Sequence, residues 1–177
     1  VPLGQSRRDC TCAAGRHPAR SLVRAGGASA LTMRRIGNRG LVVGVADMAI
    51  GAAFDVQLIT YALGSCIGLT AYDPVARLGG MLHFMLPEAD NATMQPDDND
   101  LMYAATGIPK LVDSMVARGA QEQRLILCAS GGARTLAAGR QMSIGEGNRS
   151  KMLQVLESMG LHLLAEDTRG SVARTMS

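Results

Sequence analysis

The segment LITYALGSCIGLTAYDPVARLGGMLHFMLP, residues 58–87, decides the fold of this chain. Its β-branched, aromatic and other apolar residues predict three strands: Val56–Leu63, Cys66–Asp73 and Met81–Leu86. Asp73-Pro74 opens a turn after the second strand, and Gly79-Gly80 closes it. The second and third strands are therefore expected to form an antiparallel hairpin.

Regular patterns continue after this segment and predict an α/β fold. Apolar residues at spacings of three and four predict two helices, Leu101–Gly119 and Asn148–Gly160. Apolar runs predict further strands at the start of Leu41–Ala53, at Gln123–Ser130 and at Leu161–Asp167. Pro109 is expected to bend the first helix or to end its first turns. Because a meander of strands precedes the helices, a mixed sheet is favoured over a doubly wound parallel one.

The composition is typical of one globular domain that follows a basic extension. A chain of 177 residues with 47% hydrophobic residues suffices for one core. Residues 1–40 carry eight arginines and one acidic residue, Asp9, for a net charge of +7, which leaves −4 on the rest of the chain. The extension shows no helical or strand period and is expected to be disordered. We therefore expect the folded domain to span residues 41–177.

Three functions for residues 1–40 stand beside simple disorder. An arginine-rich, acid-poor segment could bind nucleic acid or an anionic membrane, could be a transit peptide, or could hold a metal through Cys10, Cys12 and His17. The extension contains no aromatic residue for stacking on bases and no complete set of four metal ligands. The sequence therefore predicts no nucleic-acid binding, no metal and no cofactor.

Hydropathy and cysteine usage indicate where the protein works. The longest uncharged run, residues 56–72, contains glycines and polar side chains that make it a poor membrane span. The four cysteines show no disulfide framework, as is typical of the reducing cytoplasm. We expect a soluble cytoplasmic protein that does not insert into membranes.

Cys66 and His83 lie where the predicted hairpin can bring them together. A cysteine becomes a nucleophile when a nearby imidazole takes its proton, and the same imidazole can later protonate a leaving group. Gly64-Ser65 lets the backbone turn tightly before Cys66 and point N–H groups to the space beside the sulfur. Such donors would stabilise the oxyanion of a tetrahedral intermediate.

Ordinary core roles are the alternative for these residues. A lone cysteine in an apolar strand is usually a small core residue, and Cys128 fits that role completely. A lone histidine is more often a core residue that is hydrogen-bonded to a backbone carbonyl. The Gly-Ser break before Cys66 favours the hydrolase, because core packing does not require it. The residues alone leave both interpretations open.

The segment resembles the CheD chemoreceptor glutamine deamidases in a specific string of residues. The matching positions are Thr60, Gly64-Ser65-Cys66, Tyr72-Asp73-Pro74, Gly79-Gly80 and His83-Phe84-Met85-Leu86-Pro87. Further matches follow in the same order: Tyr103-Ala104, Ile108-Pro109-Lys110-Leu111, Gly131-Gly132-Ala133, Ile144-Gly145-Glu146, Asn148, Asp167, Gly170 and Arg174. The resemblance covers about residues 41–174 and leaves the basic extension unexplained.

The resemblance implies a cysteine hydrolase that converts selected glutamines in the cytoplasmic helices of chemotaxis receptors to glutamates and releases ammonia. Cys66 would be the nucleophile and His83 the base, and Thr60 would orient the imidazole. Ser65 and Gly64 would support the oxyanion. The implied fold is a mixed-sheet α/β sandwich similar to that of a toxin deamidase, and no metal or cofactor is needed.

The C-terminal part departs from the family pattern. Arg169 stands at the first glycine of the family's Asp-x-Gly-Gly-x-x-Gly-Arg pattern, and Ala173 stands at its last glycine. One or two further strands would follow the pattern where this sequence stops at Ser177, and Gly147 replaces a usual arginine. We therefore expect a domain that is short at its C-terminus, with effects on stability and substrate docking.

A non-catalytic chemotaxis adaptor is the alternative function. The resemblance also implies binding to the CheC phosphatase, so the chain could engage receptors or CheC without chemistry. Thr60, Cys66 and His83 together favour the enzyme. An adaptor has no physical need for a nucleophile, a base and a group that orients the base.

Overall fold

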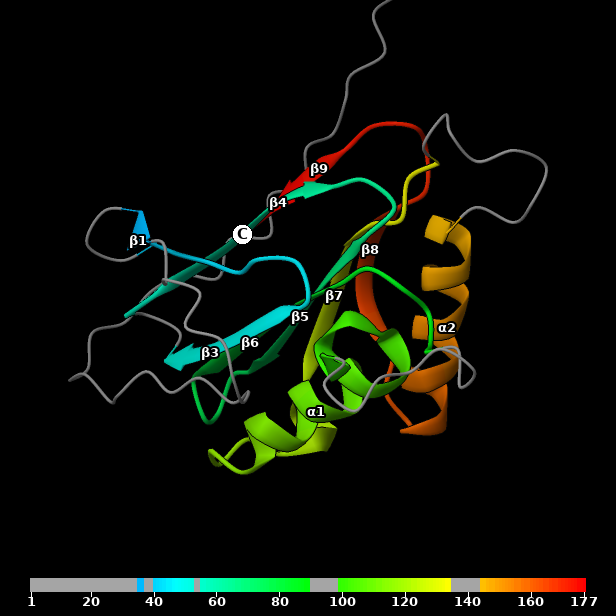
Figure 1. Cartoon of the computed structure of the whole chain (residues 1–177). Coiled ribbons are helices and arrows are strands. Elements are labelled where there is room, and N and C mark those ends of the chain that lie inside the picture. Colours follow the sequence, from blue (N-terminus) through cyan, green and yellow to red (C-terminus); the bar gives the residue numbers. More distant parts are fainter. Residues whose placement is uncertain (1–34, 37–39, 53–54, 90–98, 135–143) are drawn as a thin grey trace, which may run out of the picture.

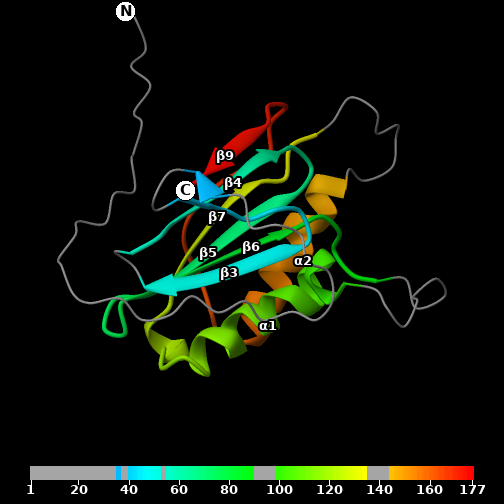
Figure 2. The ribbon, with the colours of Figure 1, turned by 60° about the vertical axis from the view of Figure 1, so that its left-hand side comes forward.

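A computed structural model describes residues 35–36, 40–52, 55–89, 99–134 and 144–177. They form three layers (Figures 1 and 2), with a four-stranded sheet on one face of a five-stranded sheet and two helices on the other. The predicted α/β sandwich with mixed sheets is confirmed. Most of the basic extension, residues 1–34 and 37–39, lies outside the described residues.

The five-stranded sheet contains the predicted hairpin at its centre. Its order is β3 (Asp47–Ala52), β6 (Leu78–Phe84), β5 (Ile67–Asp73), β7 (Ile126–Gly131) and β8 (Leu163–Thr168). Strands β5 and β6 pair antiparallel from Ile67 opposite Phe84 to Asp73 opposite Leu78, as predicted. Only β7 and β8 run parallel, so the sheet is mixed.

The four-stranded sheet differs from the prediction in its connections. Its order is β1 (Arg35–Ile36), β2 (Gly40–Val42), β4 (Gln57–Leu63) and β9 (Arg174–Met176). The segment Leu41–Ala53, which began as one predicted strand, contributes β2 to this sheet and β3 to the other, with Ala46 at a positive φ of 52° between them. Residues 35, 36 and 40 of the extension are therefore in strands rather than disordered.

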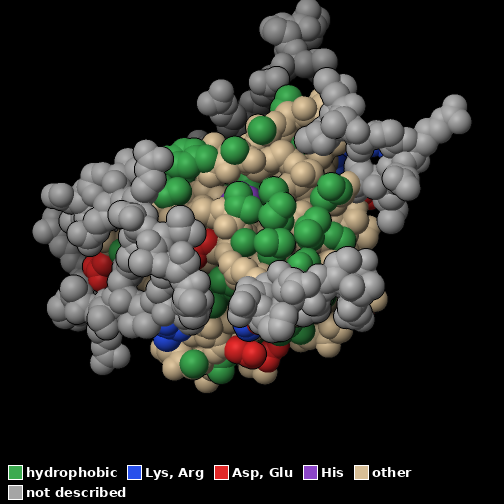
Figure 3. Space-filling model, viewed as in Figure 1, with side chains coloured by type: hydrophobic (Ala, Val, Ile, Leu, Met, Phe, Trp, Pro, Cys, Tyr) green, Lys and Arg blue, Asp and Glu red, His purple; other side chains and the backbone are tan. Residues whose placement is uncertain are grey.

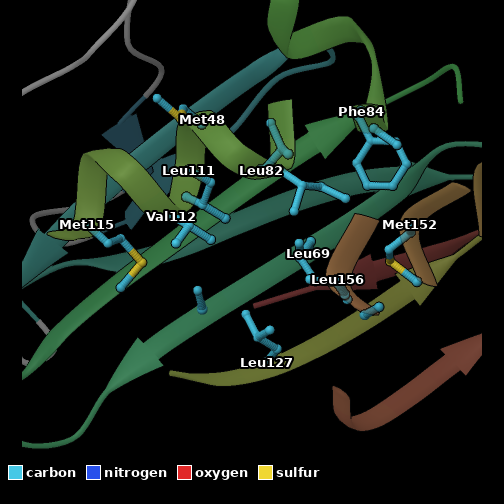
Figure 4. Packing of buried hydrophobic residues seen from close by; sticks show 14 of the residues in the cluster. Met48, Leu69, Leu82, Phe84, Leu111, Val112, Met115, Leu127, Met152 and Leu156 are labelled. Carbon is cyan, nitrogen blue, oxygen red and sulfur yellow. The ribbon is translucent and has the colours of Figure 1, made fainter. Parts of the chain in front are cut away.

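The helices cover the five-stranded sheet and enclose the core with it. Helix α1 (Ala104–Val116) and helix α2 (Ile144–Ser158) pack on the same face, and short 3-10 turns, η1 (Asp100–Met102) and η2 (Glu122–Arg124), precede and follow α1. Figure 4 shows the core side chains, including Leu69, Leu82, Phe84, Leu111, Val112, Met115, Leu127, Met152 and Leu156. Each such burial contributes about 1.5–3 kcal/mol to folding.

Tertiary contacts shift both helix starts from the predicted residues. Residues 101–103 are not in α1, because the backbone of Met102 accepts from Met85 and Leu86 at 2.9 and 3.0 Å. The helix then continues through Pro109, since the burial of its apolar face stabilises it by more than the one backbone hydrogen bond that the proline removes. Helix α2 begins at Ile144, four residues before the predicted Asn148.

The glycine pair predicted to close the hairpin turn lies inside β6 instead. Strand β6 begins at Leu78, directly after a turn that ends at Arg77 with a positive φ of 53°. A Cβ atom on Gly80 would lie 2.9 Å from side-chain atoms of both Leu111 and Met115. Gly80 therefore allows α1 to approach the sheet closely, which a turn signal alone does not reveal.

Candidate active site

Strand β6 presents His83 to the four-stranded sheet. Its neighbours Leu82 and Phe84 belong to the core under the helices, so alternation along the strand turns His83 to the opposite face. Gly68 pairs with His83 from β5, and a Cβ atom there would lie 3.2 Å from Cγ2 of Thr60. The absent side chain lets Thr60, on β4, approach the imidazole.

The hydroxyl of Thr60 determines which nitrogen of His83 carries the proton. Thr60 Oγ1 lies 2.8 Å from the carbonyl oxygen of Val43 and 2.7 Å from Nδ1 of His83. Its single proton is donated to the carbonyl, which can only accept, so Thr60 accepts from Nδ1–H. The neutral imidazole therefore holds its lone pair on Nε2.

Nε2 of His83 is buried and has no hydrogen-bond partner among the described residues. A buried acceptor without a partner costs stability, and such exceptions are typical of catalytic groups. The core interpretation of His83 expected a bond to a backbone carbonyl, whereas its ring is bonded to the hydroxyl of Thr60. This arrangement leaves a base ready to accept a proton.

Cys66 lies in the bend directly before β5. Continuing the antiparallel register from Ile67 opposite Phe84 places Cys66 opposite Met85 and diagonal to His83. Diagonal cross-strand neighbours are within reach of long side chains. This register places Cys66 and His83 near the same end of the hairpin, and Nε2 of His83 forms no hydrogen bond with the Cys66 sulfur.

The turn before Cys66 is held by the residues after β7. Gly132 N–H donates to Cys66 O at 2.8 Å, and Ala133 N–H donates to Gly64 O at 2.7 Å. Gly131 has a φ of +115°, and a Cβ atom there would overlap Cys66 O. A glycine is required at this position, because only glycine adopts that conformation readily and leaves room for the turn.

Ser65 and Gly64 have different roles in this turn. The N–H of Gly64 donates to Ala62 O at 2.8 Å, so Gly64 shapes the turn rather than offering a donor. Within the described part of the chain, the N–H of Ser65 has no acceptor. Ser65 directly precedes Cys66, and a free N–H group at this place could stabilise an oxyanion beside the sulfur.

Burial keeps both reacting groups neutral. It raises the pKa of the Cys66 thiol above its usual value, an effect that the thiol's contact with its own backbone N–H offsets in part. It also lowers the pKa of the His83 imidazole. Both shifts favour the neutral forms, a thiol and a neutral imidazole, over an ion pair at neutral pH.

Asn148 is the buried polar residue to which the sequence assigned no role. Its Nδ2 donates to Ser65 O at 2.9 Å and to Met85 O at 2.8 Å, although these residues are 83 and 63 positions away. Apolar periodicity does not reveal such contacts. The sequence offered only its match to the family string, and Val43, whose carbonyl binds Thr60, carried no signal at all.

Other sites predicted or excluded from the sequence can be placed in part. Cys10, Cys12 and His17 lie outside the described residues. Among the residues that the structure describes, no three His, Cys, Asp or Glu side chains cluster as a metal would require, and no helix is long and apolar enough to cross a membrane. Apolar side chains gather near the middle of the face viewed in Figure 3.

Known proteins share sequence with most of this chain. A sequence model of the family described as CheD, CheD chemotactic sensory transduction, matches residues 85–177. The probable chemoreceptor glutamine deamidase CheD of Solibacter usitatus is 44% identical over 136 residues, which are 77% of this chain and 80% of that protein. The protein of the same name from Pyrococcus horikoshii is 38% identical over 76% of this chain and 82% of its own length.

A solved structure adds little to this relationship. The crystal structure of Bacillus licheniformis hypothetical protein YfiH is 15% identical, with a TM-score of 0.41 over 71% of this chain and 50% of that one, a likeness too weak to support a fold or a function. The curated relatives, by contrast, are matched over most of their length at substantial identity. This chain therefore belongs to the CheD family.

Proposed function

We propose that this protein hydrolyses the side-chain amide of selected receptor glutamines to glutamate, with Cys66 as nucleophile. The lone pair on Nε2 of His83, fixed there by Thr60, is the observation that carries the proposal. The names of the curated relatives, probable chemoreceptor glutamine deamidases, supply the substrate class. The receptor's cytoplasmic helices are the proposed partner, and the cytoplasm is the proposed location.

The first half of the reaction transfers the glutaminyl group to Cys66. His83 Nε2 accepts the thiol proton as the sulfur attacks the amide carbon, and the N–H of Ser65 stabilises the resulting oxyanion. The imidazolium then returns the proton to the amide nitrogen, the C–N bond breaks, and ammonia leaves. A thioester between Cys66 and the receptor remains.

The second half releases glutamate. Water attacks the thioester carbonyl while His83 Nε2 takes its proton, and the C–S bond breaks with return of that proton to the sulfur. Thr60 accepts from Nδ1–H throughout and stabilises the imidazolium that forms twice. Every proton transfer in the proposed reaction passes through Nε2 of His83. No step calls for a metal or a cofactor.

An adaptor that binds receptors or the CheC phosphatase without chemistry is the alternative. It offers no reason for an imidazole that is buried, oriented by a hydroxyl and unpartnered at Nε2. A buried acceptor without a partner lowers the stability of the fold, and a protein that only binds has no need of it.

Mass spectrometry of a receptor cytoplasmic fragment incubated with the protein separates the two functions. A deamidase converts specific glutamines to glutamates with time, and heat-denatured protein leaves them unchanged. Binding of the fragment without any conversion, by protein that is folded, would replace the enzyme with the adaptor.

A further inference from the structure

Asn148 connects the turn before Cys66 with the residue that follows β6, the strand of His83. It lies in the first half of α2 and is completely buried, and its amide nitrogen donates to Ser65 O and to Met85 O. Ser65 directly precedes Cys66, and Met85 is two residues after His83. One side-chain amide therefore bridges the nucleophile's turn and the strand of the base.

The orientation of the Asn148 amide follows from its partners. Both partners are carbonyl oxygens, which only accept, so both N–H groups of the amide are used and Oδ1 points elsewhere. Oδ1 is buried and has no partner among the described residues. An unsatisfied buried acceptor lowers stability, so fold stability alone does not account for an asparagine at this position.

Helix α2 is held close enough to make this bridge. A Cβ atom on Gly145 would lie 2.6 and 2.7 Å from the carbonyl oxygens of Gly132 and Ala133, so the start of the helix touches that backbone directly. The same backbone donates to Cys66 O and Gly64 O. The turn before Cys66 is thus bonded to Gly132 and Ala133, directly after β7, and to Asn148 on α2.

We propose that Asn148 is a positioning residue that fixes the Cys66 sulfur relative to Nε2 of His83. The inference rests on the proposed function in taking these two groups as the reacting pair. Cys66 precedes β5 and His83 is on β6, so the distance between them depends on how the two strands are tied together at this end. A misplacement of about 1 Å in such a pair costs roughly 10²-fold in rate.

Steady-state kinetics of Asn148→Ala and Asn148→Asp on a receptor fragment test this role. Asp has nearly the same shape and so leaves no cavity, but its carboxyl donates no hydrogen bond when ionised and only one when protonated, so it breaks the bridge where Ala does not fold. We expect kcat to fall by about 10–10²-fold with KM nearly unchanged, because the substrate surface is not altered. Met152→Ala is the matched control, since Met152 is equally buried one turn later on α2 and belongs to the hydrophobic core. It should lower Tm and leave kcat of the folded protein unchanged.

Alkylation of Cys66 by iodoacetamide at neutral pH tests the same inference without a receptor. The rate is followed on the Cys66 peptide by mass spectrometry, with and without His83→Ala, in the unmutated and Asn148→Ala proteins. If Asn148 sets the pairing, His83→Ala slows alkylation strongly in the unmutated protein and hardly at all in the Asn148→Ala background.

The outcomes of this cycle are distinct. An equal effect of His83→Ala in both backgrounds overturns the positioning role and leaves the deamidase proposal intact. No effect of His83→Ala in either background removes the Cys66–His83 pair and the inference with it. Loss of coupling in Asn148→Ala, with no receptor conversion by the unmutated protein, supports the inference while the proposed deamidation fails.

Discussion

The smallest feature of the site is the hydroxyl of Thr60, which accepts a hydrogen bond from one side and donates one to the other. Its contacts with Val43 O and with His83 Nδ1 span the two sheets. We predict that Thr60→Val, which removes the hydroxyl at nearly constant shape, lowers kcat by about 10–10²-fold, part of the contribution of general-base catalysis. Thr60→Ser restores the acceptor and should recover most of the activity. Equal kcat values for the valine and serine variants would exclude the hydroxyl as the orienting group.

We expect the protonation of His83 to determine the pH below which kcat/KM falls. Burial lowers its pKa, so the imidazole stays neutral at pH values where an exposed histidine is already protonated. We predict that kcat/KM is level from pH 7 to 8 and falls only below about pH 6.5, the ordinary histidine value. Because burial raises the pKa of the Cys66 thiol, this group does not ionise at neutral pH. The profile measured on a receptor fragment contradicts this account if activity already declines between pH 8 and 7.

At the scale of elements, the turn before Cys66 depends on a glycine in β7. Gly131 and Gly119 both have positive φ, at +115° and +100°, but a Cβ atom at Gly131 meets Cys66 O whereas nothing lies within 4 Å at Gly119. Alanine at either position costs about 1–3 kcal/mol in backbone strain. We predict that both variants unfold at lower urea concentration and that only Gly131→Ala loses most of its deamidase activity. Equal activity of the two folded variants would show that this contact does not shape the site.

At the scale of the whole molecule, a buried carboxylate ties the far end of the hairpin to the segment before β7. Asp73 is fully buried and accepts from Arg124 at 2.8 Å and from the backbone N–H groups of Val75, Ala76 and Gln121. The Arg124 guanidinium, with these N–H groups, holds the pKa of Asp73 well below its usual range.

The Asp73 cluster predicts a loss of stability in acid. A carboxyl with a lowered folded-state pKa stabilises the fold above its unfolded pKa, near 4, and loses that contribution as the pH falls through the folded value. We predict that Asp73→Asn unfolds at lower urea concentration than the unmutated protein at pH 7, and that the difference shrinks below about pH 4. A difference that stays constant down to pH 2 would contradict this assignment.

The sequence predicted the central hairpin, because alternation and turn residues are local signals, and the pairing of Cys66 with His83 stays a prediction. It did not predict that the strand of Thr60 belongs to another sheet, and only the family string indicated a role for this residue. Asn148 could not be found, since its two bonds join positions more than 60 residues apart. The early start of α2 was missed because the close approach of Gly145 to the backbone of Gly132 and Ala133, after β7, overrides its low helix propensity.

Dependence of glutamine conversion on Cys66 is the most direct test of this account. Conversion of a receptor cytoplasmic fragment is measured over time by mass spectrometry with the unmutated protein, with Cys66→Ala and with Cys128→Ala, whose cysteine is also half-buried but lies within β7. We predict conversion by the unmutated and Cys128→Ala proteins at similar rates and none by Cys66→Ala, which still binds the receptor. Conversion by folded Cys66→Ala at the unmutated rate would contradict the cysteine mechanism.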